Sequence, residues 1–302
     1  MRLNFLHFRS RSFKMVCGLT VAFAASESNA QTWQGGTNVW DVGSNWVGLR
    51  PPSSTSATAR IATAGDPVPA LGGASVSTFT GLTQQGGLAL VRATLRGSPP
   101  SQNEALLRQP GSILLTRKGD SIGNGTITRI LRFWPSGIDQ VILHVQLSDG
   151  SQAVILRQNT NGYLTLLRTG APAPGTGRVA TLGSISAVDV HPITGHYAIL
   201  GSLSGAPARS NQALWTGTAA VGVDETPSEA LRLPILRLRK GDRYSTPATP
   251  LGTIRSLAIK PAADATGGSA RGLGQAIAST GDLVTFVTTD GNITELLLLP
   301  PG

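Results

Sequence analysis

The sequence predicts an all-β fold of about four repeats of four short antiparallel strands, arranged as a β-propeller-like or an irregular β-repeat array. Among the 302 residues, 37 are glycine and 19 are proline, which is typical of short strands joined by tight turns. Similar segments also recur along the chain, with their first residues 53, 56 and 86 positions apart. Apolar residues make up 40% of the chain, which is enough for a packed core.

The clearest repeated element is an apolar strand that ends in a polar turn. Its four copies are Leu88 to Gly97, Val141 to Gly150, Tyr197 to Gly205 and Leu283 to Gly291. In the second copy, Val141, Leu143, Val145 and Leu147 alternate with the residues between them. This period of two predicts a half-buried strand.

Three further elements complete each repeat. A second apolar strand follows the turn, at Glu104 to Arg108, Ala153 to Arg157, Gln212 to Trp215 and Thr294 to Leu299. The third element is Ile113 to Asp120, Leu164 to Ala171 and Ile235 to Asp242, with Ile61 to Asp66 as a degenerate first copy. The fourth strand is Val76 to Leu82, Ile127 to Trp134, Leu182 to Val190 and Ile254 to Ile259.

Neighbouring sheets must stack, because a four-stranded sheet of this size cannot bury both of its faces alone. We therefore expect one repeat domain over residues 61–302. Two segments rich in glycine, alanine, threonine and proline lengthen the last interval, Thr216 to Leu233 and Ala262 to Leu273, and are expected to be loops. Four units can close a small propeller, and an open array or part of a larger assembly fits the pattern equally well.

Residues 1–30 have the three regions of a cleavable secretory signal. Four basic residues precede an apolar run from Met15 to Ala25, which is too short to span a bilayer, and the small residues Ser28 and Ala30 precede the expected cleavage after Ala30. The alternative is a buried amphipathic helix of a cytosolic protein. Cleavage predicts a secreted or periplasmic chain without an integral membrane anchor, and it removes the only cysteine, Cys17.

The expected mature chain opens with a tryptophan-rich segment, residues 31–60. Trp33, Trp40 and Trp46 lie within TWQGGTNVWDVGSNW. These side chains could be a stacking platform that binds sugar rings, because aromatic faces bind apolar sugar surfaces. They could equally be a packed cap over the first strand edge, and we favour the cap because terminal repeats need such covers.

The repeats resemble those of secreted bacterial tandem-repeat proteins, in which a segment of the type LLRxGDxxP precedes a GxxAF strand. The segments LLTRKGDSIG (114–123), LLRTGAPAPGTG (166–177) and LRLRKGDRYSTP (236–247) carry this resemblance, although the alanine-phenylalanine pair is mostly replaced. The W-x-G-G, W and N-W opening resembles the head of adhesin-like and autotransporter-passenger proteins. The resemblance implies a propeller-like repeat architecture and brings no catalytic residues with it.

The charge distribution gives no sign of nucleic-acid binding. Loss of the four basic residues and Glu27 of the signal lowers the net charge from +9 to +6. The remaining excess is scattered arginine, as at Arg92, Arg132 and Arg157, and aromatic residues make up only 5%. Nucleic-acid recognition favours a clustered basic patch interleaved with aromatic residues. We therefore expect a cell-surface glycan or a protein as partner and no nucleic acid.

Common catalytic motifs are missing from the sequence, which has no G-x-S-x-G elbow, no Walker loop, no H-E-x-x-H and no EF-hand pattern. The Gly-Asp pairs that end in Asp66, Asp120 and Asp242 could suggest repeated cation sites. However, Ala171 replaces the acid in one copy, and aspartate is common in turns, so we favour turns. We expect no cofactor.

One group of residues, Asp189, His191 and His196 in DVHPITGH, is a more specific candidate site than the Gly-Asp pairs. If Pro192 to Gly195 form a four-residue hairpin loop, the two histidines face each other, and Asp189 lies on the same side. Two histidines and a carboxylate are a recognised metal-binding set, so these residues are a candidate metal site. The alternative is a polar turn at the edge of one sheet, which is more common.

The sequence therefore favours a secreted, non-catalytic surface or binding protein of the adhesion type. The alternative is a hydrolase or lyase on a propeller-like scaffold, with a metal near Asp189, His191 and His196. Propeller enzymes usually draw several acids, histidines or tyrosines toward one face, whereas the expected mature chain holds only three histidines and fifteen acidic residues.

Overall fold

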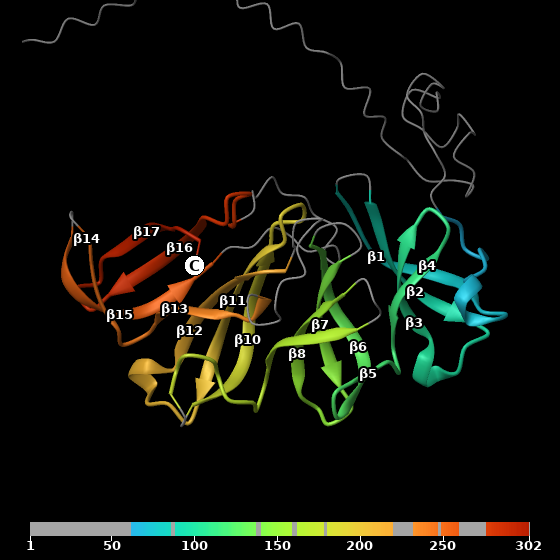
Figure 1. Cartoon of the computed structure of the whole chain (residues 1–302). Helices are drawn as coiled ribbons and strands as arrows, with labels where there is room; N and C mark the ends of the chain where they lie inside the picture. Colours follow the sequence, from blue (N-terminus) through green and yellow to red (C-terminus); the bar gives the residue numbers. More distant parts are fainter. Residues whose placement is uncertain are drawn as a thin grey trace, which may run out of the picture. The chain divides into compact units, whose positions relative to one another are not determined.

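The computed structural model describes residues 62–85, 88–136, 140–158, 162–177, 180–219, 232–246, 249–259 and 276–301. This part of the chain is all-β, as predicted, and forms four antiparallel sheets, which we number I to IV in chain order (Figure 1). Within the described ranges no helix is long and apolar enough to cross a membrane. The expected signal and the three tryptophans of the opening segment lie outside the described residues.

Each sheet is built from consecutive strands. Sheet I contains β1 (Ser75–Gln85), β2 (Leu88–Arg96), β3 (Glu104–Gln109) and β4 (Ile113–Arg117). Sheet II contains β5 (Ser121–Ile122), β6 (Gly125–Pro135), β7 (Val141–Leu147), β8 (Gln152–Arg157) and β9 (Tyr163–Arg168). Sheet III contains β10 (Thr181–Val190), β11 (His196–Ser204), β12 (Gln212–Thr218) and β13 (Ile235–Arg239). Sheet IV contains β14 (Arg243–Thr246), β15 (Thr249–Ala258), β16 (Leu283–Thr289) and β17 (Thr294–Leu299).

A four-residue turn, which we call the crossing turn, precedes each of the four sheets, and its last three copies carry the chain from one sheet to the next. Its copies are 63–66, 117–120, 168–171 and 239–242. In the second copy the Asp120 amide donates to Arg117 O at 3.2 Å, the Gly119 amide donates to Ile127 O at 2.7 Å, and the Ile127 amide donates to Asp120 O at 2.9 Å. The third position needs glycine, because its φ lies between 83° and 99° in all four copies.

The crossing turn shortens the third predicted element of each repeat. The strands β4, β9 and β13 end at Arg117, Arg168 and Arg239, and the residues up to Asp120, Ala171 and Asp242 belong to the turns. The described part of the degenerate copy, residues 62–66, is likewise a crossing turn rather than a strand.

The first long strand of each sheet, which we call the leading strand, is irregular. The pairing register of β1, β6 and β10 shifts twice at equivalent places, and that of β15 shifts once. Each shift inserts an unpaired residue, and at some of the shifts two neighbouring side chains are exposed together, such as Thr128 with Arg129 and Arg255 with Ser256. The bulged strands thus present polar side chains and outward-facing backbone groups.

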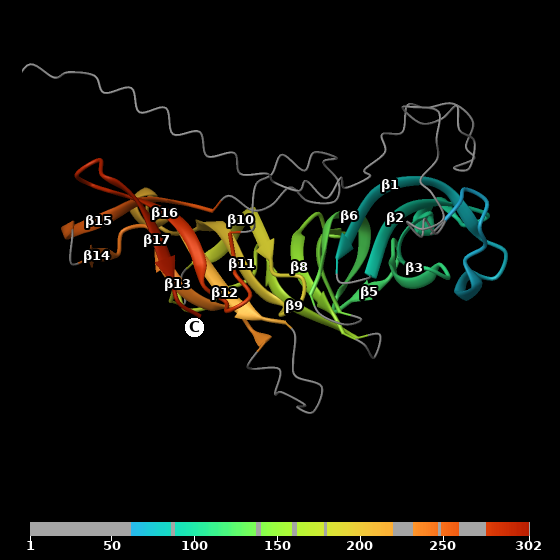
Figure 2. The ribbon, with the colours of Figure 1, turned by 90° about the horizontal axis from the view of Figure 1, so that it is seen from above.

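Apolar side chains join each sheet to the next. Leu106 of sheet I packs with Leu143 of sheet II, in one cluster, and the adjacent Ile142 packs with Trp215 of sheet III in another. A third cluster joins Leu214 of sheet III to sheet IV. Because neighbouring residues of a strand point to opposite faces, each inner sheet is covered on both sides, as in the succession of sheets that Figure 2 shows.

Sheets I and III are alike, and sheets II and IV are alike. The loops after β2 and β11 contain the short 3-10 helices η3 (Pro100–Gln102) and η4 (Ala208–Ser210), and β1 and β10 are preceded by a proline bridge, Pro67 to Ser75 and Pro172 to Thr181. A third 3-10 helix, η2 (Pro69–Leu71), precedes β1. Sheets II and IV instead begin with the short strands β5 and β14. The described array therefore resembles two copies of a two-sheet unit, although sheet II has a fifth strand, β9, that has no counterpart among the described strands of sheet IV.

Candidate functional site

Polar side chains at the start of the third long strand of sheets I and III bind the next leading strand. In sheet III, Gln212 Nε2 donates to Leu257 O at 2.9 Å, and Gln212 Oε1 accepts from the Leu257 amide at 2.8 Å. The strand β14 pairs with β15 only between Thr249 and Thr253, so Gln212 takes the place of a strand partner beyond that point. This side chain connects sheets III and IV.

Two charged residues of sheet I, Arg92 and Glu104, bind the leading strand of sheet II in a similar way. Arg92 Nη1 donates to Ile130 O at 2.6 Å, and the Ile130 amide donates to the Glu104 carboxylate. Burial raises the pKa of Glu104, although the Arg92 guanidinium and the Ile130 amide both oppose this shift. In sheet II, the equivalent Gln152 bonds instead to His144, with Oε1 and Nε2 3.0 Å apart. Arg92 and Glu104 therefore connect sheets I and II, whereas Gln152 is bonded within sheet II.

A second polar network joins sheets I and II. The Tyr163 hydroxyl donates to Asp120 Oδ2 at 2.8 Å, and the Thr116 hydroxyl bonds to both groups. Burial raises the pKa of Tyr163, so the phenol stays protonated. The buried Arg157 donates from Nε to Leu115 O across the same interface. A cavity of about 390 Å³ lies beside Asp120 and Tyr163.

The Gly-Asp pairs hold the crossing turns. Asp66 Oδ2 accepts from the amide of Thr63 at 2.6 Å, and Asp120 and Asp242 make the equivalent bonds at 2.9 and 3.0 Å. Ala171 keeps the same backbone turn without a carboxylate, since its amide donates to Arg168 O at 3.2 Å. The carboxylates of these pairs therefore act as caps of a turn.

Asp189 of the candidate metal site is bonded to backbone. It is 1% exposed, and its Oδ2 accepts from the amides of Ala276 and Ile277 at 2.7 and 3.0 Å. Because a buried carboxylate needs such donors, Asp189 anchors the segment before β16 to sheet III. The sequence offered no sign of this role, since the partners lie 87 and 88 residues away.

The two histidines lie at the hairpin between β10 and β11. The His191 amide donates to His196 O at 2.7 Å, His191 Nδ1 lies 2.9 Å from Thr194 Oγ1, and His196 Nδ1 lies 2.8 Å from Thr218 Oγ1. Burial lowers the pKa of both imidazoles. Among the described residues, no group of three or more histidine, cysteine, aspartate or glutamate side chains is placed to hold a metal ion.

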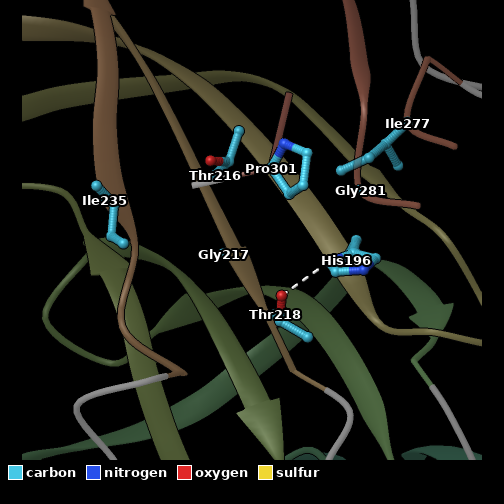
Figure 3. Close-up of a pocket in the computed structure, with 8 residues that line it drawn as sticks. All are labelled: His196, Thr216, Gly217, Thr218, Ile235, Ile277, Gly281 and Pro301. Carbon is cyan, nitrogen blue, oxygen red and sulfur yellow. Dashed lines mark hydrogen bonds between the residues drawn. The ribbon is translucent and has the colours of Figure 1, made fainter. Parts of the chain in front are cut away.

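Next to His196 lies a narrow pocket, shown in Figure 3. His196 points toward Gly281 and Ile277, and its hydrogen bond to Thr218 closes one side. The pocket measures about 40 Å³, which is room for one or two water molecules and not for an organic ligand.

A larger groove, of about 510 Å³, lies between sheets III and IV. Three cations line it: Arg209 from η4, Lys240 from the crossing turn and Arg255 from the bulge of β15. One carboxylate, Asp290, comes from the turn before β17. The buried Ile254 forms part of its wall. We call this set of residues the basic groove.

Hydrogen bonds position the charged groups of the basic groove. Lys240 Nζ and Arg255 Nη1 each donate to an asparagine side-chain oxygen, at 3.2 and 2.8 Å. Asp290 Oδ1 accepts from the Thr253 amide at 3.2 Å, and this bond lowers the pKa of Asp290. The groove thus combines three positive charges with one ionised carboxylate, so the cations are in excess.

No sequence pattern marks the basic groove, because its residues come from separate loops and from the strand β15, between positions 208 and 290. Comparison of the first and second two-sheet units would have revealed the groove, because Ser101 and Thr128 of the first unit occupy the positions that Arg209 and Arg255 occupy in the second. The other candidate binding residues, Trp33, Trp40 and Trp46, lie outside the described residues. No family model, curated protein or solved structure matches the chain.

Proposed function

We propose that this chain is a secreted, non-catalytic binding protein of the surface or adhesion type, whose stacked sheets present a ligand groove. The observation that carries the proposal is the basic groove, a space of about 510 Å³ lined by charged side chains from four separate loops and strands. Its volume falls in the range of small-ligand sites in proteins. A fold of stacked repeats suits such a role, because loops of adjacent units meet at each interface.

The way the chain uses its carboxylates supports binding rather than catalysis. Asp66, Asp120 and Asp242 cap crossing turns, and Asp189 accepts two backbone amides. A general acid or base must reach the proton that it transfers, and carboxylates held by backbone amides are committed to the fold.

Export is supported by the sequence of residues 1–30, with its basic start, apolar run and small residues before Gln31. The +6 charge expected after cleavage would favour acidic partners outside the cytoplasm.

The test combines fractionation with a binding screen. The producing cell is separated into cytoplasm, periplasm and medium, the exported chain is purified, and its N-terminus is sequenced. We expect export and a first residue Gln31. The purified chain is then applied to a glycan array, and bound glycans are incubated with it and analysed by chromatography. Binding without change of the glycan supports the proposal. An uncleaved cytoplasmic chain, no bound glycan, or a cleaved glycan would overturn it.

A further inference from the structure

We infer that the basic groove between sheets III and IV binds an acidic oligosaccharide, a chain of uronic acid units whose carboxylates meet Arg209, Lys240 and Arg255. The inference rests on the proposed function and specifies its ligand. Arginine presents a planar set of donors that matches a carboxylate, and two arginines and a lysine lie around one groove.

The backbone turns and bulges around the basic groove also form at another interface of the protein, where most of the charged residues are missing. The interface between sheets I and II has the same crossing turn, the same loop with a 3-10 helix and the same leading-strand bulge. Positions equivalent to Arg209, Lys240, Arg255 and Asp290 hold Ser101, Lys118, Thr128 and Ser148. Ser148 Oγ accepts from the Thr126 amide at 3.1 Å, as Asp290 does from Thr253 at 3.2 Å.

Three of the four charged positions are thus neutral in the first two-sheet unit, and only the lysine is shared. The turns and bulges therefore form equally well with serine and threonine at these places. The local fold therefore does not require Arg209 and Arg255, and the groove that they line together with Asp290 is the natural place for their function.

The wall of the groove favours a sugar over a bare inorganic anion. Ala208 and the methylene stems of Arg209, Lys240 and Arg255 give the groove its apolar surface, and the buried core around Ile254 lies beneath it. A sugar ring has an apolar face that packs on such a surface, while its hydroxyl groups bind polar neighbours. Asp290 can accept from those hydroxyl groups, since its pKa is lowered and it is ionised at neutral pH.

The experiment measures binding of a galacturonic acid tetrasaccharide to the exported chain by isothermal titration calorimetry. The matched ligand is the same tetrasaccharide with every carboxylate methyl-esterified, which keeps the rings and removes the charge. We expect binding of the acid, at least about tenfold weaker binding of the ester, and weaker binding of the acid as salt rises from 50 to 500 mM. This rise in salt shortens the Debye length from about 14 to about 4 Å.

The test variant is Arg209→Ser with Arg255→Thr, which copies the residues of the first interface. The control variant is Arg96→Ser with Arg129→Thr, which removes two exposed arginines from sheets I and II. We expect the test variant to lose at least about tenfold in affinity with an unchanged melting temperature, and the control to bind like the parent.

Equal binding of acid and ester, equal affinity of parent and test variant, or an equal loss in the control would overturn this inference. Binding to other glycans on the array without binding to the galacturonate chain would overturn it too and leave the proposed function standing. No binding to any glycan would overturn both.

Discussion

Replacing Gln212 by leucine should destabilise the contact between sheets III and IV. Leucine has a similar size and can neither donate nor accept, so the bonds to Leu257 O and to the Leu257 amide, at 2.9 and 2.8 Å, are both lost. Each bond contributes about 1 kcal/mol net, and each stranded backbone group adds part of its desolvation cost. We expect the free energy of unfolding to fall by about 2 to 4 kcal/mol.

Thermal unfolding followed by circular dichroism measures this loss. For a chain of this size, 2 to 4 kcal/mol corresponds to a fall in melting temperature of about 4 to 16 °C. The matched control is Gln158→Leu, a half-buried glutamine just after β8, for which we expect a change within about 0.5 kcal/mol. A melting temperature of Gln212→Leu that differs from the parent by no more than the control would refute the role of Gln212 as the partner of β15.

Three further outcomes are expected. Asp189→Ala should lower the free energy of unfolding by about 2 to 5 kcal/mol in urea titrations, because two buried amides lose their acceptor, and an effect below 1 kcal/mol would contradict this. Asp120→Ala should cost about 1 kcal/mol more than Asp242→Ala, since Asp120 also accepts from a tyrosine hydroxyl; equal losses would count against the interface network. Burial lowers the pKa of His144 below its ordinary value of 6.5, so the unfolded chain takes up more protons below that pH. The contribution of His144 to stability should therefore be constant well above pH 6.5 and fall as the pH drops, and His144→Leu should show a smaller fall in melting temperature between pH 7 and 5 than the parent.

Local patterns predicted the fold well. The apolar run of Val141 to Leu147 and the glycine turn after it are properties of neighbouring residues, and they become β7 and its turn as expected. The expected half-burial of this strand is wrong, because sheet III covers Ile142 on the face that the alternation left to solvent. The bulges of the leading strands escaped prediction, because an inserted residue breaks the period of two. In β6, Arg129 and Arg132 follow such insertions, and their segment keeps no clean alternation.

The site depended on distant residues. Asp189 and the two histidines are close in sequence, yet the fold directs the carboxylate to amides of residues 276 and 277 and each imidazole to a threonine. The basic groove joins residues between 208 and 290, so no local motif encodes it. Alignment of the two-sheet units against each other carries the information that a search for contiguous motifs does not.

The crossing turn has a consequence for how such a chain can grow. The backbone bonds at each passage are the same, whether the fourth residue is Asp120 or Ala171. A segment that begins and ends at this turn can therefore be duplicated or deleted as a cassette, without a new junction to design. The two halves of this array have similar loops, and they differ in the charge of one groove. This is the form expected when a duplicated segment keeps its backbone turns and later changes its surface residues.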